Sequence, residues 1–262
     1  MTTERILANA AFGDDPGCWP LPPATTPHQL WLRAVVAGGQ GRYASALADL
    51  AAVCRRHRGG PLVSLAHSSR ASFLRQLGWH VLARRWDGRA SALAGGDLQA
   101  GADALIGLAA DALGVGRFAA SAAALDRAAG LLNEFAPPRL PVRLAWVSAE
   151  LAMARGDGPD AVGHAQRAVD LAAESGSTRH ALKSDVVLAA AWCSAGKLDS
   201  ARQIADPALE TAGHLGMVPL RWALACLLAD IGSAAWPTAQ VVAIRDDAAD
   251  TVRRLGGVWS AR

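Results

Sequence analysis

Glycines recur along this chain at nearly even intervals, and each of them lies between two stretches rich in alanine and leucine. The members of this series are Gly41, Gly78, Gly116, Gly156, Gly196 and, less regularly, Gly232, so that successive members stand 36 to 40 residues apart. An interval of this length holds two helices and a turn, which predicts helix pairs stacked in a row. One pair cannot bury its own apolar face, so each pair must pack on the next. Glycine is expected at the turn within each pair because it reaches positive φ without strain.

Small side chains stand at fixed distances from these glycines. Seven residues before each of them is an alanine, in the order Ala34, Ala71, Ala109, Ala149, Ala189 and Ala225. Five residues after the glycine a second small residue follows in most units, such as Ala46, Ser121 or Ala161. Small residues allow two helices to approach closely, so both columns are predicted to be buried between helices.

The composition supports a purely helical chain. Of the 262 residues 52% are hydrophobic but only 5% are aromatic, and alanine and leucine favour helices. No run of alternating β-branched residues predicts a strand. We expect a short helix at residues 3–11 and six helix pairs. Their expected ranges are 28–38 with 42–57, 62–77 with 79–94, 98–113 with 117–133, 141–154 with 158–174, 178–194 with 198–213, and 219–231 with 237–255.

The chain divides into three parts by composition. Residues 1–26 form a proline-rich N-terminal arm, residues 27–255 carry the repeats, and residues 256–262 form a C-terminal tail. The prolines of the arm, from Pro16 to Pro23, cannot continue a helix. The arm is expected either to be disordered or to pack on the repeats with Trp19 as its anchor.

Two units carry a fuller pattern that resembles tetratricopeptide (TPR) repeats. The pattern is a glycine, an aromatic residue two positions later, and then a small, a large and a small residue. It is found in Gly41, Tyr43, Ala46, Leu50 and Val53, and again in Gly116, Phe118, Ser121, Leu125 and Ala128. The units are longer than the usual 34 residues, and in this they are similar to the degenerate repeats of bacterial LuxR-type and SARP-type transcriptional regulators. The resemblance implies an all-α, right-handed α-solenoid of about six antiparallel helix pairs.

The resemblance also implies a concave groove that holds a peptide or protein segment. Trp31, Trp146 and Trp222 stand ten residues before their turn glycines, in a column that faces this groove in the family; the alternative is that they fill the core. With neighbouring columns, the expected groove residues are Trp31, Ser72, Arg75, Asp103, Arg143, Trp146, Glu150, Lys183 and Trp222. His28 falls in the same columns. Arg143 and Lys183 could hold a carboxylate or an acidic peptide, or could simply form a solvated face.

Enzymatic motifs are not found. Residues 114–119 fit the pattern GxGxxA, but no strand precedes them, so a dinucleotide site is not expected. The seven histidines are dispersed and the four cysteines are widely spaced, which predicts neither a metal site nor a disulfide framework. No catalytic residue, metal ligand or cofactor is expected.

The charge pattern and the apolar stretches limit the partners. The net charge is +3, and the densest basic run, residues 55–58, falls at an expected helix end, where cations are favoured. Direct binding to nucleic acid is therefore not expected. No signal peptide or membrane-length apolar stretch is found, which favours a cytoplasmic protein.

These observations predict a non-enzymatic, regulatory adaptor or scaffold that binds a protein or peptide of unknown identity in its concave groove. The alternative is a regulatory sensor that binds a small molecule between the repeats. The last expected helix, residues 239–255, either caps the array or pairs with a second copy in a homodimer.

Overall fold

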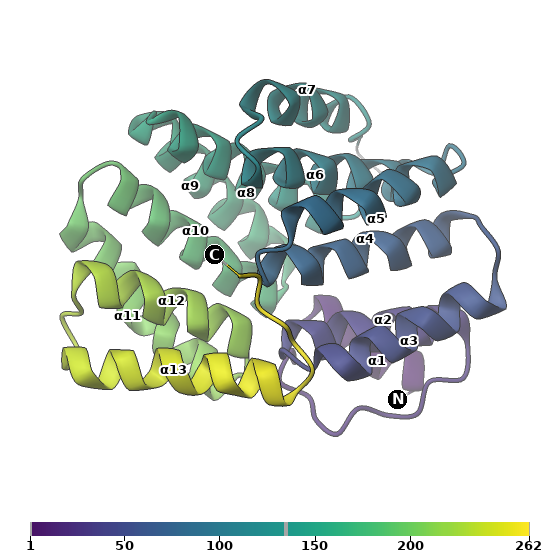
Figure 1. The fold of residues 1–262 in the computed structure, drawn as a ribbon, viewed down its shortest axis with the longest axis horizontal. Coiled ribbons are helices and arrows are strands. Elements are labelled where there is room, and N and C mark those ends of the chain that lie inside the picture. Colours follow the sequence, from purple (N-terminus) through teal and green to yellow (C-terminus); the bar gives the residue numbers. More distant parts are fainter. Residues whose placement is uncertain (1, 134–135, 262) are drawn as a thin grey trace.

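The structure is a computed structural model that describes residues 2–133 and 136–261 (Figure 1). These ranges hold thirteen α-helices, and the predicted all-α class is confirmed. The helices are α1 (Thr3–Phe12), α2 (Pro27–Gly39), α3 (Tyr43–Arg56), α4 (Pro61–Gln76), α5 (His80–Leu93), α6 (Leu98–Gly114), α7 (Phe118–Ala129), α8 (Arg139–Arg155), α9 (Gly158–Ser175), α10 (Thr178–Ser194), α11 (Leu198–His214), α12 (Val218–Ile231) and α13 (Thr238–Arg254). Each expected helix is present to within a few residues; α7 ends earlier than expected, at Ala129.

From α2 onward the helices pack in consecutive antiparallel pairs, as expected for a helical repeat. The first members of the pairs, α2, α4, α6, α8, α10 and α12, are called the inner helices below. Each inner helix contacts both the second helix of its own pair and the next inner helix. This arrangement gives the molecule an inner face made of alternate helices.

The two columns of small residues lie where the spacing predicts. All six alanines that precede the turn glycines by seven residues are 0% exposed. Ala46, Ser121 and Ala161 in the second column are also 0% exposed. At Gly116 the backbone has φ +73°, and its N–H donates to the carbonyl of Leu113 as the helix ends. Residues 114–119 thus span the end of α6, the turn at residues 115–117 and the start of α7.

The two ends of the array meet. The Ala44 N–H, at the start of α3, donates to the Leu255 carbonyl at the end of α13 over 2.9 Å. Beyond α13 the tail crosses to α4, where the Ser260 N–H donates to the carbonyl of Leu77 over 2.9 Å. The indole Nε1 of Trp79 donates to the carbonyl of Val258 over 2.7 Å. Figure 1 shows the tail passing from α13 toward α4 and closing the row of pairs.

The N-terminal arm packs on the repeats. Helix α1 contacts both α2 and α10, and the Thr178 N–H donates to the carbonyl of Gly13 over 3.0 Å. The Gln40 side chain donates to the carbonyls of Pro16 and Cys18. The guanidinium of Arg42 lies 3.5 Å from the ring centroid of Trp19. Within the described residues, none of the helices combines the length and hydropathy that a bilayer crossing demands.

Candidate ligand pocket

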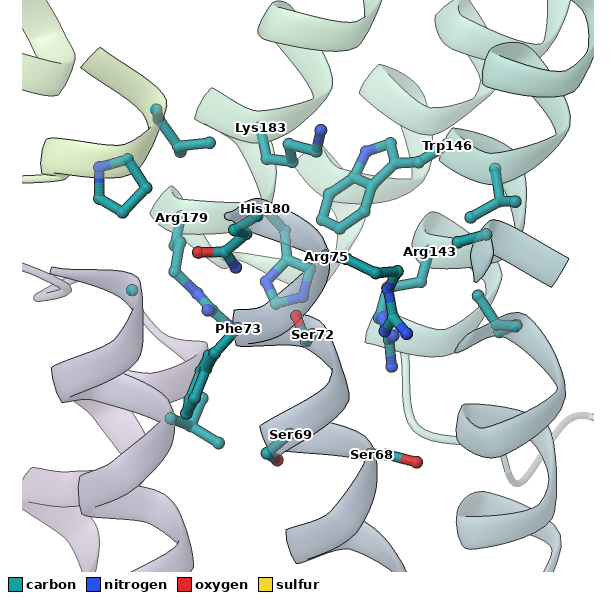
Figure 2. A pocket seen from close by; sticks show the side chains of 18 of the residues that line it. Ser68, Ser69, Ser72, Phe73, Arg75, Arg143, Trp146, Arg179, His180 and Lys183 are labelled. Atoms are coloured by element: carbon teal, nitrogen blue, oxygen red, sulfur yellow. The ribbon is translucent and has the colours of Figure 1, made fainter. Parts of the chain in front are cut away.

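A pocket of about 440 Å³ lies on the inner face, and all six inner helices contribute to its wall (Figure 2). Every one of the nine expected groove residues lines this pocket. They are Trp31, Ser72, Arg75, Asp103, Arg143, Trp146, Glu150, Lys183 and Trp222. His28 does not line it: its side chain is half-exposed, and its Nδ1 lies 2.9 Å from a carboxylate oxygen of Glu4 on α1. The repeat columns therefore bring together residues from helices far apart in sequence.

The tryptophans form an apolar part of the wall. Trp31 is only 4% exposed, so it belongs to the core and to the pocket at once. Its Nε1 donates to Ser69 Oγ over 3.0 Å, and Trp146 Nε1 donates to Ser184 Oγ over 2.8 Å. The ring centroids of Trp222 and of Trp259 in the tail are 4.3 Å apart. Because the indole N–H groups of Trp31 and Trp146 are already bonded, these two side chains offer apolar ring surface to a ligand.

Arg75 on α4 is held by two buried carboxylates. Its guanidinium donates to Asp111 over 3.0 Å and to Asp87 on α5. Both aspartate side chains are 0% exposed. Burial raises the pKa of Asp87 to about 7, although the charge of Arg75 acts in the opposite direction and lowers this pKa. Other units carry an apolar residue at the place of Asp87, so this network interrupts the repeat pattern.

Glycines on α6 make room for this network. A Cβ on Gly107 would stand 2.2 Å from Asp87 Oδ2. A Cβ on Gly114 would stand 2.1 Å from Nδ1 of His80, which also lines the pocket. Both contacts are far too close, so a glycine is required for these polar side chains to lie against α6.

Gly107→Ala is expected to lower the free energy of unfolding by about 1–3 kcal/mol, because the added methyl group displaces the Asp87 carboxylate from Arg75. Urea denaturation followed by circular dichroism measures the change. Gly163→Ala is the matched control: this helical glycine has nothing within 4 Å of its Cβ position, and alanine should stabilise the helix by about 0.5–1 kcal/mol. Equal stabilisation by both substitutions would show that the Asp87 carboxylate does not exclude a methyl group at position 107.

A second ion-pair group joins α6 and α8. Arg139 and Arg143 both contact Asp103, which is 3% exposed. Burial lowers the pKa of both arginines to about 10. The single carboxylate of Asp103 balances only one of the two guanidinium charges.

Arg179 on α10 adds a third guanidinium to the same wall. Within the described residues it forms no ion pair with a carboxylate, and its buried Nε has no hydrogen-bond partner. Burial, followed by the charge of Arg139, lowers the pKa of Arg179 to about 10. Figure 2 shows Arg179 beside His180 and across the pocket from Arg143.

His180 lies between these arginines and the aromatic wall. It is 2% exposed, its Nδ1 lies 2.8 Å from Ser177 Oγ, and its ring stacks on Trp146 at 5.4 Å between centroids. Burial first, and then the charges of Arg179, Arg139 and Arg143, lower the pKa of His180 well below its usual value. The imidazole is therefore neutral near pH 7 and adds no cationic charge.

From the sequence, Arg143 and Lys183 either hold a carboxylate or form a solvated charged face. In the structure both have carboxylate partners: Arg143 contacts Asp103, and Lys183 Nζ lies 3.4 Å from a carboxylate oxygen of Glu150. The uncompensated guanidinium is that of Arg179, which sequence reasoning missed. A signal was present, because Arg139 and Arg179 both stand seventeen residues before a turn glycine, one helical turn before Arg143 and Lys183.

No protein-family model matches this chain, and no curated protein matches it either. In the described part of the chain, no three His, Cys, Asp or Glu side chains come together as metal ligands. What the pocket offers is apolar ring surface beside an excess of buried guanidinium groups.

Proposed function

We propose that this protein is a non-enzymatic regulatory protein that binds a small molecule in the pocket of a TPR-like α-solenoid. The pocket where the inner helices converge supports this proposal most directly. Its volume of about 440 Å³ lies within the range of about 300–1,000 Å³ that is usual for small-molecule sites. Its wall combines tryptophan surface with a few charged groups, as such sites do.

A small molecule fits this pocket better than a long peptide. A peptide laid along a solenoid needs an open concave face. Here the ends of the array meet, and Trp259 of the tail lines the pocket beside Trp222. A protein partner or a second copy of the chain remains a proposal for the outer surface. We place the protein in the cytoplasm by the same proposal, since no helix of the described residues could cross a membrane.

A metabolite screen by thermal shift tests the proposal. One chemical class should raise the Tm in a saturable manner, because a ligand at 100 times its Kd adds about 2.7 kcal/mol to stability. Ala110→Phe should abolish the shift, since Ala110 lines the pocket and a phenyl ring fills it. Ala123→Phe, on the exposed face of α7, is the matched control and should keep the shift.

Two outcomes would contradict the proposal. If no class of metabolite shifts the Tm, the pocket does not bind small molecules. If Ala110→Phe remains folded by circular dichroism and shows the full shift, the ligand binds elsewhere.

A further inference from the structure

We propose that the ligand is an organic oxyanion, a carboxylate or a phosphate monoester, on a planar apolar body. Arg179 binds the oxyanion together with Arg143 and Arg139, and the body packs against Trp146. This inference rests on the proposed small-molecule function of the pocket and names its ligand class.

The pocket wall carries more guanidinium than carboxylate groups, and this excess of positive charge favours an anionic ligand. Arg139, Arg143 and Arg179 all line the pocket, and Arg139 and Arg143 share the carboxylate of Asp103. Among the described residues, no other carboxylate forms an ion pair with these three arginines. An isolated buried charge is costly unless it is paired. A guanidinium offers a planar set of donors that matches a carboxylate or a phosphate group. An oxyanion between these arginines therefore supplies the missing counter-charge.

The other carboxylates in or near the pocket wall are engaged elsewhere. Asp87 and Asp111 bind Arg75, and Glu150 lies beside Lys183. Asp87 acts on Arg143 through space, but its carboxylate oxygen accepts a hydrogen bond from Arg75. None of these pairs involves Arg179.

The position of Arg179 is fixed by packing. A Cβ on Gly39 of α2 would stand 3.2 Å from Arg179 Cδ, so the side chain of Arg179 crosses from α10 to α2. Its neighbour His180 stacks on Trp146. Arg179 is thus held at the pocket wall, and its buried Nε has no hydrogen-bond partner among the described residues.

The body of the ligand is set by the surface next to these arginines. Phe12, Trp31 and Trp146 all line the pocket near His180. The indole N–H groups of Trp31 and Trp146 bond serine hydroxyls, so the remaining surface is ring carbon. A flat aromatic group fills such a space by ring packing.

Isothermal titration calorimetry with four matched probes tests this inference. The probes are 2-naphthoate, 2-naphthyl phosphate, the neutral 2-naphthamide and the cationic 2-naphthylmethylamine, each up to 10 mM. We expect at least one anion to bind 10-fold or more tightly than the amide and the amine. The ratio between the two anions distinguishes a carboxylate site from a phosphate site.

Variants then locate the oxyanion. Arg179→Gln should weaken the anion 10-fold or more and leave the amide unchanged, whereas Arg179→Lys should retain part of the preference. Arg84→Gln is the matched control, since Arg84 is exposed on α5 and lies outside the pocket. Circular dichroism checks that each variant is folded; removing an unpaired buried charge should not lower the Tm.

Three results would overturn the inference. The first is equal binding of all four probes, and the second is binding of none of them. The third is an unchanged anion affinity in Arg179→Gln. A ligand of another charge class from the metabolite screen would leave the small-molecule function standing and exclude only the oxyanion.

Discussion

Replacing Arg75 with methionine is expected to lower the free energy of unfolding by about 3–5 kcal/mol. The substitution keeps an apolar stem but removes the one counter-charge that, among the described residues, directly contacts Asp87 and Asp111, whose side chains are 0% exposed. Two carboxylates would then face each other in the interior. Urea denaturation followed by circular dichroism at pH 7 measures the loss.

A combined variant separates lost charge pairing from lost packing. Adding Asp87→Asn and Asp111→Asn to Arg75→Met removes the unpaired charges and should recover a large part of the loss. Arg85→Met, at an exposed position on α5, should change stability by less than about 0.5 kcal/mol. A loss of under 1 kcal/mol in Arg75→Met would mean that the aspartates are already neutral when the protein folds.

Trp259→Ala is expected to cost about 2–4 kcal/mol, somewhat less than a fully buried tryptophan, because its side chain is only partly buried. The substitution removes the ring contact with Trp222. It should also weaken the packing of the tail near the end of α4, where the Ser260 N–H donates to the Leu77 carbonyl. Amide hydrogen exchange gives a second measure: the Ser260 N–H, bonded to the carbonyl of Leu77, should lose its protection.

Val258→Ala is the matched control for the tail. The Val258 side chain is 67% exposed, and its carbonyl still accepts from Trp79. This variant should change stability by less than about 0.5 kcal/mol. Equal effects of the two substitutions would show that the tail stabilises the array through its backbone and that the Trp259 ring adds nothing.

The sequence allowed the helices and much of the pocket wall to be predicted, because both follow the repeat. The alanine columns and turn glycines obey short-range geometry, and a residue's place in a unit fixes which way it faces. Trp146 and Lys183 could be placed on the inner face for that reason. Arg139 and Arg179 lie in the next column toward the helix N-termini, outside the columns from which the groove residues were predicted.

Two residues that depart from the repeat pattern take part in contacts that the sequence did not predict. His80 and Asp87 break the pattern of the second unit. In the structure Asp87 pairs with Arg75, and His80 lines the pocket. The network could not be deduced from one unit, because Arg75 lies on the other helix of the same pair and Asp111 lies on α6 of the next pair.

The meeting of the two ends was beyond sequence reasoning. It depends on small rotations between successive pairs, which add up along the whole array. The closing hydrogen bonds involve Leu255, Val258 and Ser260, which lie outside the periodic columns. The same limit explains His28, which faces Glu4 of α1 and lies away from the pocket.

The closing contacts between α3, α4 and the segment after α13 affect how the protein unfolds. In an open row of repeats the outermost units have one neighbour each, and unfolding can begin there by fraying. Here the terminal units also hold each other, so neither end can melt without breaking contacts of the other. Partly unfolded forms are disfavoured for this reason, and the chain is expected to behave as one cooperative unit rather than as a series of separable repeats.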